Sequence, residues 1–543
     1  MRISGLASGM DIDEIVQEMM RAERKKVDVV EQNKQTLEWK QEAYQTVNRL
    51  VANFILESKK AFGLTQTTVF GGLVSGGVKN LDWVKSAYVT NQVAEARAMA
   101  GAVEGNYELE VLQLAANWAV ASKEPISVGN KGNLAEQFGL EGEIDFTIVT
   151  NRGEVRITKS DLSSVHISDV VNEINQADIG VKAIYDQTMD RFFLQTTQSG
   201  SGQTVKIVEE GISFMVGVDS ALKLGCEEGV VYSGKDALFN WGAAEGITQE
   251  NNTFILNGVQ ITLKETGMTR ISVATNVDEV VKKVTDFVDA YNELVDKLNL
   301  LVGEKRYPDF KPLTDEQKEE MTEKQIEKWE SKAKSGLLKS DRLLEKMLQT
   351  MRMGMYQVVE GVEGSFSQLT QLGITTEGYV AGSRGGKLVV DTAKLTEAVL
   401  TDVDGVLELF FKTADSHLAL KSEDQLSAEE IKAKRAQSGL ITRLYDNLIV
   451  EMKGVITQAG TGEDSNLYRS VSSLMLLDFV TTHGSISMID KNIGQLEDRI
   501  DTINYYLVKR EARYWQQFTA MEKAINQMNQ QSAWLMEQFG GGF

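Results

Sequence analysis

The sequence predicts an α+β multidomain protein: long heptad helices at both ends form a coiled-coil leg, followed by a helical bundle domain and two β-rich domains inserted in hierarchy. Three observations predict this fold class. Apolar residues recur in steps of three and four from Ile486 to Phe539, which is typical of a helix that needs a partner helix. A matching seven-residue repeat ends near Gly63. Between them, stretches such as Tyr107–Leu114 alternate apolar and polar residues, as half-buried strands do.

Size and composition exclude several classes of protein. A chain of 543 residues exceeds one hydrophobic core, so three or more domains are expected. A formal net charge of −21 argues against nucleic acid or an anionic membrane surface as a partner. No run approaches the roughly 18–20 apolar residues of a membrane span, and Asp11, Asp13 and Glu14 interrupt any apolar signal-peptide core.

The C-terminal heptad helix would be roughly 80 Å long, at about 1.5 Å per residue. Its apolar seam consists of Ile486, Ile489, Ile493, Leu496, Ile500, Ile503, Leu507, Tyr514, Phe518, Met521, Ile525, Met528, Leu535 and Phe539. The step from Tyr514 to Phe518 is a second consecutive step of four, a stutter that locally unwinds a coiled coil. We interpret it either as a joint between two halves of a leg or as a local packing irregularity.

The N-terminal helix is expected to begin near Asp11, whose carboxylate can accept first-turn amides, with Glu14 completing a capping box. Its apolar face comprises Ile12, Ile15, Val16, Met19 and Met20, followed by Val30, Leu37, Tyr44, Val47, Val51, Phe54 and Ala61. Asn33 and Lys40 interrupt the early repeat. Because the two ends carry matching heptads, we expect these helices to pack together.

The middle of the chain predicts two β-rich parts. The outer part includes strands at 87–93 and 107–114, which we expect to pair with strands at 253–256, 260–264 and 270–274, with a hairpin at Asn257-Gly258. The inner part has a hairpin around residues 151–153, a helix at 168–176 capped by Ser168, and strands at 181–186, 191–196 and 205–208. The expected domains are 1–40 with 500–543 (leg), 41–70 with 278–499 (helical), 71–115 with 246–277 (β-rich) and 116–245 (inserted).

The remaining helical region carries recognisable start signals. Residues 278–302 form a helix, Thr314 and Gln317 form a capping box for a charged helix that extends to about Lys334, and Ser340 caps the next. A hairpin is expected at 374–390 and helices at 392–399, 406–411 and 437–457. The 314–334 charge run is interpreted as a solvated helix face, with a partner surface as the alternative.

No motif predicts an enzyme. The loop from Ala381 to Leu388 lacks the first Gly and the Ser or Thr of a phosphate loop. Asp402 and Asp404 are better explained as a helix cap than as calcium ligands. His166, His417 and His483 lack zinc-ligand spacing, and the single Cys226 is expected to be a small buried hydrophobe. We therefore expect no cofactor and no metal.

Several stretches, in the right order, resemble the flagellar filament cap family, also called the hook-associated protein 2 family. The opening Ile3-Ser-Gly-Leu-Ala-Ser-Gly-Met-Asp-Ile-Asp13 is similar to its N-terminal signature. Residues 372–374, 386–395, 404–410 and the closing helix 485–539 resemble its C-terminal region. Residues 167–208, centred on Ile174-Asn175, resemble the small repeat of flagellins and hook-associated proteins, whereas 115–140 and 210–245 match nothing.

The resemblance implies a structural cap at the distal tip of the bacterial filament, outside the cell. Its members form a ring of copies, often a pentamer, whose terminal helices dock on the filament and under which flagellin folds and inserts. It also implies hook–filament junction proteins, the flagellar type III export apparatus and its chaperone as partners, without nucleic acid or membrane insertion. Some members are adhesins, so the alternative function is a surface-binding module that uses the inserted domain.

We expect self-association and filament docking through apolar residues of both terminal helices. They are Ile12, Ile15, Met19, Leu507, Tyr514, Phe518, Met521, Ile525, Met528, Trp534, Leu535 and Phe539. The alternative is that these helices form an intramolecular bundle only. Docking is favoured because the apolar residues continue almost to the C-terminus, beyond the reach of a partner helix of equal length.

Overall fold

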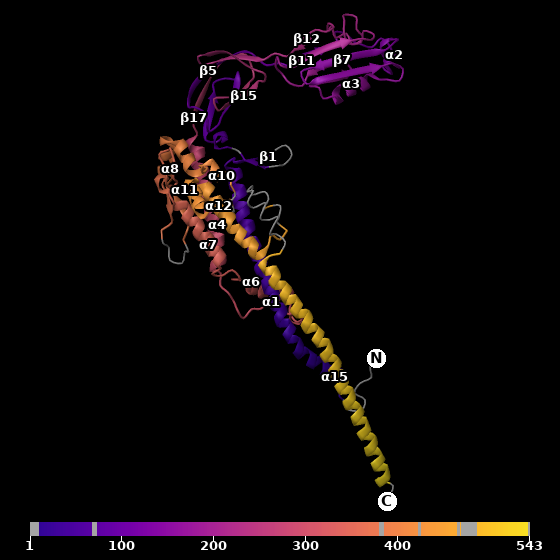
Figure 1. Ribbon diagram of the computed structural model, residues 1–543, viewed down its shortest axis with the longest axis vertical. Helices are drawn as coiled ribbons and strands as arrows, with labels where there is room; N and C mark the ends of the chain where they lie inside the picture. The colour runs from indigo at the N-terminus through magenta and orange to yellow at the C-terminus, as the bar shows by residue number, and fades with distance from the viewer. Residues whose placement is uncertain are drawn as a thin grey trace. The chain divides into compact units, whose positions relative to one another are not determined.

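The computed structural model describes residues 10–67, 73–75, 77–378, 385–421, 425–463, 467 and 486–540 (Figure 1). The chain divides into two compact units: residues 77–280 form one, and residues 1–76 together with 281–543 form the other. The first is rich in strands and the second is mainly helical, so the expected α+β multidomain class is confirmed. The expected four-part division is finer than this and stays a prediction.

The helical unit is built around α1 and α12. Its helices are α1 (Ile12–Ala61), α4 (Val277–Gly303, which begins at the end of the β-rich unit), α5 (Asp315–Glu319), α6 (Glu323–Lys334), α7 (Arg342–Tyr356), α8 (Thr392–Thr401), α9 (Val403–Phe411), α10 (Ser416–Ala419), α11 (Ala428–Gln437), α12 (Leu440–Ala459) and α15 (Met488–Gly540), with the short helix η2 (Leu369–Leu372). Two small antiparallel pairs accompany them, β1 (Thr65–Thr67) with β2 (Leu73–Ser75) and β18 (Ile374–Thr376) with β19 (Leu388–Val390).

The second half of α1 is buried on several sides, because it packs on α12 as well as on α15. Val47, Val51, Ala52 and Ile55 have no exposed surface. These residues extend beyond a two-position heptad seam, so this half of α1 is a core helix rather than one strand of a coiled coil.

Arg443, at the start of α12, ties together the ends of two other helices. Its guanidinium group is fully buried and donates to the carbonyls of Gly354 and Gln357 at 3.2 and 2.9 Å, at the end of α7. It also donates to Ala436 and Ser438 at 3.1 and 2.9 Å, at the end of α11. Burial lowers the pKa of Arg443 to about 10. The side chain thus satisfies carbonyl groups that the ends of these helices leave unpaired.

The helix starts in this unit only partly follow the sequence signals. Thr314 caps α5 as predicted, but the charged helix is interrupted: Thr322 begins α6 with a second capping box, its N–H donating to Gln325 Oε1 at 2.9 Å. The predicted cap at Ser340 is wrong. Ser340 has a φ of 52°, and the cap of α7 is Asp341, which accepts the Leu343 N–H at 3.1 Å.

Other predictions for this unit are confirmed. Asp402 caps α9 by accepting the Gly405 N–H at 2.7 Å, although the helix begins three residues earlier than expected. The hairpin between 374 and 390 is confirmed by β18 and β19. Residues 381–384 of the Gly-rich loop lie outside the described residues, as do the N-terminal signature up to residue 9, His483, and all of 468–480.

The β-rich unit contains two hydrophobic cores. The first lies between the five-stranded sheet β14-β13-β5-β17-β3 and the three-stranded sheet β15-β16-β4. Their bounds are β3 (Lys85–Val89), β4 (Ala94–Ala98), β5 (Gly105–Gln113), β13 (Ala237–Trp241), β14 (Ala244–Gln249), β15 (Thr253–Leu256), β16 (Val259–Leu263) and β17 (Gly267–Thr275), with the short helix η1 (Val78–Asn80) before β3.

The strand pairing confirms that the chain returns to the first sheet after an insertion. β17 pairs with both β3 and β5, and β16 pairs with β4. The β15–β16 hairpin turns at Asn257 and Gly258, with φ of 50° and 80°, as a type I′ turn requires. The predicted boundary at residue 245 is wrong: β13 lies before it and pairs with β5. The predicted strand at 87–93 also ends early, at Val89.

The inserted part has its own core. Its strands are β6 (Ala119–Ala121), β7 (Ile144–Thr150), β8 (Gly153–Lys159), β9 (Val181–Asp186), β10 (Arg191–Thr196), β11 (Thr204–Glu209) and β12 (Val231–Ser233), and its helices are α2 (Leu134–Phe138) and α3 (Ile167–Gln176). They form the sheets β12-β11-β7-β8 and β6-β10-β9. The predicted strands from 144 to 209 are confirmed, whereas Ser168 is not the cap: α3 begins after His166, whose N–H donates to Asp169 at 2.8 Å.

Two details define this inserted part. Cys226 is buried in its core, as predicted, and burial raises the pKa of its thiol. The entry and exit of the insertion lie side by side, because Ala116 and Lys235 exchange two backbone hydrogen bonds of 2.8 Å. The insertion therefore spans about 117–234, and its ends are already held together by the scaffold.

Candidate docking surface on the terminal helices

The two terminal helices pack side by side, as expected, and they run antiparallel (Figure 1). Lys34 Nζ of α1 lies 2.7 Å from Glu497 Oε1 of α15, and Gln41 Nε2 donates to Asp490 Oδ1 at 2.7 Å. Nearer the start of α1, Arg510 pairs with Glu23. This register places Ile12, the first residue of α1, level with about residue 520 of α15.

Both helices begin at polar caps that fix their first turns. The Asp11 carboxylate accepts the Glu14 N–H at 3.0 Å. In α15, Ser487 Oγ accepts the Asp490 N–H at 3.1 Å while Ser487 N donates to Asp490 Oδ2 at 2.8 Å. These bonds satisfy amide groups that the first helical turn leaves unpaired. Because Gln41 donates to the same Asp490, the cap also joins α15 to α1.

A narrow apolar seam holds the two helices together. Its buried residues are Ile12, Val16, Met20, Val27 and Leu507, against which Ile500, Ile503, Tyr514, Trp515 and Phe518 pack partly buried. The seam ends where α1 begins. Burial of such side chains stabilises the pair by about 25 cal/mol per Å² of apolar surface removed from water.

The predicted docking residues therefore fall into two groups. Ile12 and Leu507 are buried, and Tyr514 and Phe518 pack against them, so these four hold the leg together within one chain. Ile15 is half-buried and Met19 is exposed at the edge of the seam. Helix α15 runs unbroken through the stutter at 514–518, so the stutter is not a break in the helix.

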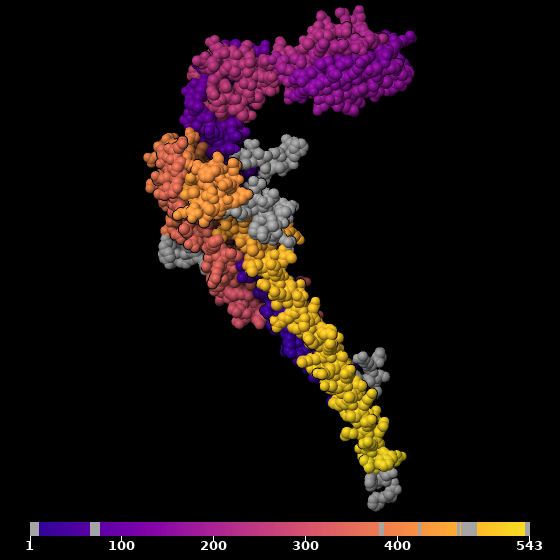
Figure 2. Space-filling view, in the orientation of Figure 1, coloured from indigo at the N-terminus to yellow at the C-terminus, as the bar shows by residue number. Residues whose placement is uncertain are grey.

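The second group lies beyond the seam. Met521 and Ile525 are half-buried, whereas Met528, Trp534 and Leu535 are 67%, 57% and 46% exposed. Figure 2 shows this part of α15, in yellow, projecting beyond the start of α1, in indigo. The side chain of Phe539 lies outside the described residues. The structure thus brings the first group together within the chain and leaves the second on a single helix.

Heptad reasoning missed several residues of this surface. Trp515 joins the seam because the stutter turns the residue after Tyr514 toward α1. Met536, Tyr505, Tyr506 and Val508 are more than half exposed although they are apolar or aromatic. No spacing rule distinguishes these residues from seam residues in advance. The pairs Tyr505-Tyr506 and Leu535-Met536 nevertheless give a signal, because one seam position cannot accommodate two large neighbouring side chains.

Among the described residues, no group of three or more His, Cys, Asp or Glu side chains is placed to hold a metal ion. In the same part of the chain, no helix combines the length and apolar character needed to cross a membrane.

Comparison with known families gives two matches that cover most of the chain. The model for the N-terminus of flagellar hook-associated protein 2 matches residues 8–117, and the model for its C-terminus matches residues 234–530. The interval between the two matches coincides with the insertion whose ends meet at Ala116 and Lys235.

Individual relatives agree with these matches. Flagellar hook-associated protein 2 of Halalkalibacterium halodurans is 31% identical over 99% of this chain and 100% of its own length. The Salmonella typhimurium protein of the same name is 24% identical over 71% of this chain and 68% of its own. The crystal structure of the D1-D2-D3 domains of the Escherichia coli flagellar cap protein FliD shares the fold, with a TM-score of 0.51, 17% identity and coverage of 78% and 97% of the two chains. The chain therefore belongs to the flagellar hook-associated protein 2 family, whose members are structural proteins of the flagellum and not enzymes.

Proposed function

We propose that this protein caps the distal end of the flagellar filament outside the cell, and that it docks there through the end of α15. One observation carries the proposal: α15 continues for about twenty residues past the level of Ile12, with Met528, Trp534 and Leu535 exposed. A single exposed helix with large apolar side chains is a surface that a partner groove can bury. The family, and the cap function named for the Escherichia coli relative, support the same role.

The chemistry of this segment suits repeated binding and release. Between 523 and 540 only Lys523 and Glu537 are charged, and six side chains are Asn or Gln. Methionine side chains adapt to irregular surfaces because they are unbranched and polarizable. One such helix binds weakly on its own, but several copies in a ring hold firmly while single legs let go. A cap of this kind retains flagellin at the tip while subunits fold and insert beneath it.

Removing the exposed segment tests this role. Deletion from residue 523 onward spares Tyr514 and Phe518, so the seam with α1 stays intact. We expect this variant to be exported and folded, to support no filament growth, and to let flagellin monomers escape into the medium. The triple change Met528→Ala, Trp534→Ala and Leu535→Ala should act in the same direction.

The matched control is Gln527→Ala with Gln531→Ala, two exposed polar positions on the same segment. Filaments of normal length from the deletion variant would contradict the docking role. The proposal includes a ring of copies, flagellin, the hook–filament junction proteins, and the export apparatus with its chaperone as partners. The number of copies is read directly from the mass of the assembled cap.

A second candidate function, surface binding by the insertion, has one specific observation in its favour. The insertion has its own hydrophobic core and joins the scaffold where Ala116 and Lys235 already pair. Replacing 117–234 with a short turn should therefore leave the scaffold folded. If the insertion is an adhesin, this variant grows filaments but loses attachment of cells to host cells or glycans; equal attachment would leave the cap role alone.

A further inference from the structure

One side of the paired terminal helices carries a basic groove. It has a volume of about 650 Å³, its floor is formed by Ile503 and Leu507 of the seam, and Tyr506 lies at its edge. Four cationic side chains line it against the single carboxylate of Glu23; they are Lys26, Lys509, Arg510 and Arg513. We call this surface the basic groove. It is an exception on a chain with a net charge of −21.

The charge of the basic groove is not balanced by the residues that the structure describes. Glu23 is shared by Lys26, at 2.8 Å, and Arg510. The hydrogen bond from Lys26 and the charge of Arg510 hold the pKa of Glu23 below its usual value, so this carboxylate stays ionised near neutral pH. Lys509 lies over the ring of Tyr505 at 4.3 Å, which does not cancel its charge. Lys509 and Arg513 therefore favour an external anionic partner.

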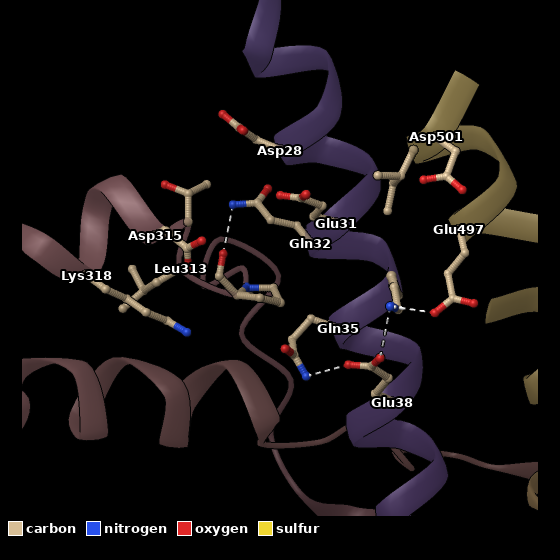
Figure 3. Close-up of a pocket in the computed structure, with 14 residues that line it drawn as sticks. Asp28, Glu31, Gln32, Gln35, Glu38, Leu313, Asp315, Lys318, Glu497 and Asp501 are labelled. Carbon is tan, nitrogen blue, oxygen red and sulfur yellow. Dashed lines mark hydrogen bonds and ion pairs between the residues drawn. The ribbon is translucent and has the colours of Figure 1, made fainter. Parts of the chain in front are cut away.

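A second hollow, lined by α1, α15 and the segment 312–318, has the opposite charge (Figure 3). It has a volume of about 580 Å³ and is lined by six carboxylates and two lysines; these are Asp28, Glu31, Glu38, Asp315, Glu497 and Asp501, with Lys34 and Lys318. We call it the acidic pocket. Both lysines already have partners, Lys34 with Glu497 at 2.7 Å and Lys318 with Glu330 at 3.5 Å.

The two surfaces lie on opposite faces of the helix pair. A residue that precedes a seam residue points about 100° to one side of it, and a residue that follows points about 100° to the other. In α1, Lys26 precedes Val27 and Asp28 follows it. In α15, Arg513 precedes Tyr514 and Asp501 follows Ile500. The basic groove thus faces one way and the acidic pocket the other.

We propose that the basic groove of one copy receives the acidic pocket face of a second copy of this chain. Charge complementarity supports this occupant, because the chain itself carries the matching surface on its opposite face. A contact between two different patches of identical subunits repeats from copy to copy, and it forms a ring when the rotation between neighbouring copies closes. The inference specifies how legs meet in the oligomer of the proposed function, on which it rests.

The geometry of the contact follows from the positions of the two surfaces. The groove centres near Arg510 and the pocket near Glu497 to Asp501, so they are offset by roughly 16 Å along the leg at about 1.5 Å per residue. Neighbouring legs that satisfy both surfaces are therefore tilted across each other rather than level and parallel. Tyr506, which is 61% exposed, is buried in this contact.

Charge reversal tests the proposal on the full-length chain. One variant carries Lys509→Glu and Arg513→Glu, and a second carries Glu31→Lys and Asp501→Lys. Sedimentation velocity measures self-association at several protein and salt concentrations. We expect each variant to associate about tenfold more weakly than the natural chain or worse, because like charges then face each other. Association of the natural chain should weaken as salt rises from about 0.05 to 0.5 M.

Two combinations of these charge reversals test whether the effect is specific. A chain with all four reversals again has complementary faces and should regain association. Mixing the two double variants should form pairs, because the natural groove of one meets the natural pocket of the other. The control is Lys282→Glu with Lys432→Glu, which changes the net charge as much as the groove variant does, at exposed positions of α4 and α11, and should associate normally.

The outcomes separate this inference from the cap role. Unchanged association in either double variant, a natural chain that stays monomeric, or failure of the mixture to pair would overturn the inference. Circular dichroism shows that each variant retains its helices, so loss of association is not loss of fold. Filament growth is scored separately: a chain that pairs through these faces but supports no filament refutes the cap role alone.

Discussion

Helix α15 is continuous, but its two parts have different surroundings. From Met488 to Met521 it follows α1, and from there to residue 537 it is a single helix whose side chains are almost all exposed. Apolar residues recur in both parts, yet ten of the 34 residues from 488 to 521 are charged, against three of the 19 from 522 to 540. The difference indicates two tasks: the paired part fixes the leg within one chain, and the unpaired end contacts something else.

The charged side chains of the paired part restrict α1 and α15 to one pairing register. Ion pairs such as Lys34 with Glu497 and Arg510 with Glu23 fix one register between α1 and α15. Such exposed pairs add little stability, but mismatched charges disfavour other registers. The unpaired end has almost no charges to fix a register, so it can slide or bind at several positions. A leg that must release and rebind benefits from that lack of specificity.

The largest expected effect comes from placing the same charge in each part. Leu507→Asp removes a buried apolar side chain from the seam and desolvates a carboxylate there, and should destabilise the α1–α15 pairing by about 3 kcal/mol. Met528→Asp places the same group on the exposed end and should change stability by less than about 0.5 kcal/mol. Amide hydrogen exchange over residues 12–27 measures the first effect.

Filament growth should be sensitive to Met528→Asp, the variant that leaves stability almost unchanged. Met528→Asp should impair filament growth although the leg remains paired, because a charge enters the docking surface. Equal protection of residues 12–27 in both variants would show that the seam does not hold the leg together. Normal filaments with Met528→Asp would show that the exposed end does not dock.

A smaller effect tests the other half of α1, which is buried on several sides. Asn48 is fully buried, and among the described residues neither its amide nitrogen nor its amide oxygen has a hydrogen-bond partner. An unsatisfied buried amide costs stability, so Asn48→Leu, which keeps the number and branching of the side-chain heavy atoms, should stabilise the protein by about 1–2 kcal/mol. Urea denaturation measures this change, with Gln527→Ala as an exposed control. Destabilisation by Asn48→Leu would reveal an ordered water or another partner for the amide.

The sequence predicts most of this architecture because the spacing of apolar residues shows which face of a single helix or strand is buried. The heptads of α1 and α15, the alternating strands around β5 and the turn at Asn257-Gly258 all depend on local spacing, and the structure confirms them. The sequence does not distinguish a sealed seam residue from an exposed one. Leu507 and Met528 occupy equivalent positions in the pattern, and only the level at which α1 begins makes one buried and the other exposed.

The wrong predictions share one physical reason: the spacing of residues in the sequence does not show which partner makes a hydrogen bond. β13 was assigned to the insertion because its partner β5 is far away in the chain, and pairing over that distance leaves no local signal. The caps at Ser168 and Ser340 were wrong because a neighbouring residue, His166 or Asp341, makes the hydrogen bonds instead. The sequence carries no local signal for the basic groove or the acidic pocket. The groove combines residues of α1 and α15, the pocket adds residues 312–318, and only folding brings these segments together.

The smallest expected effect concerns acid and the start of the paired part. Burial raises the pKa of Asp490, but hydrogen bonds from Ser487 and Gln41 outweigh it, so the pKa lies below its ordinary value. A lowered pKa in the folded state stabilises the fold at pH values above the pKa of the unfolded chain, and this contribution disappears as pH falls through the folded value. Below about pH 4 the first turn of α15 should therefore loosen, whereas the unpaired end, which lacks such a cap, should not respond. Hydrogen exchange over 488–500, compared with 523–537, measures the difference. Asp490→Asn should remove the pH dependence at 488–500, and an equal acid response in that variant would assign the loosening to other carboxylates of the leg.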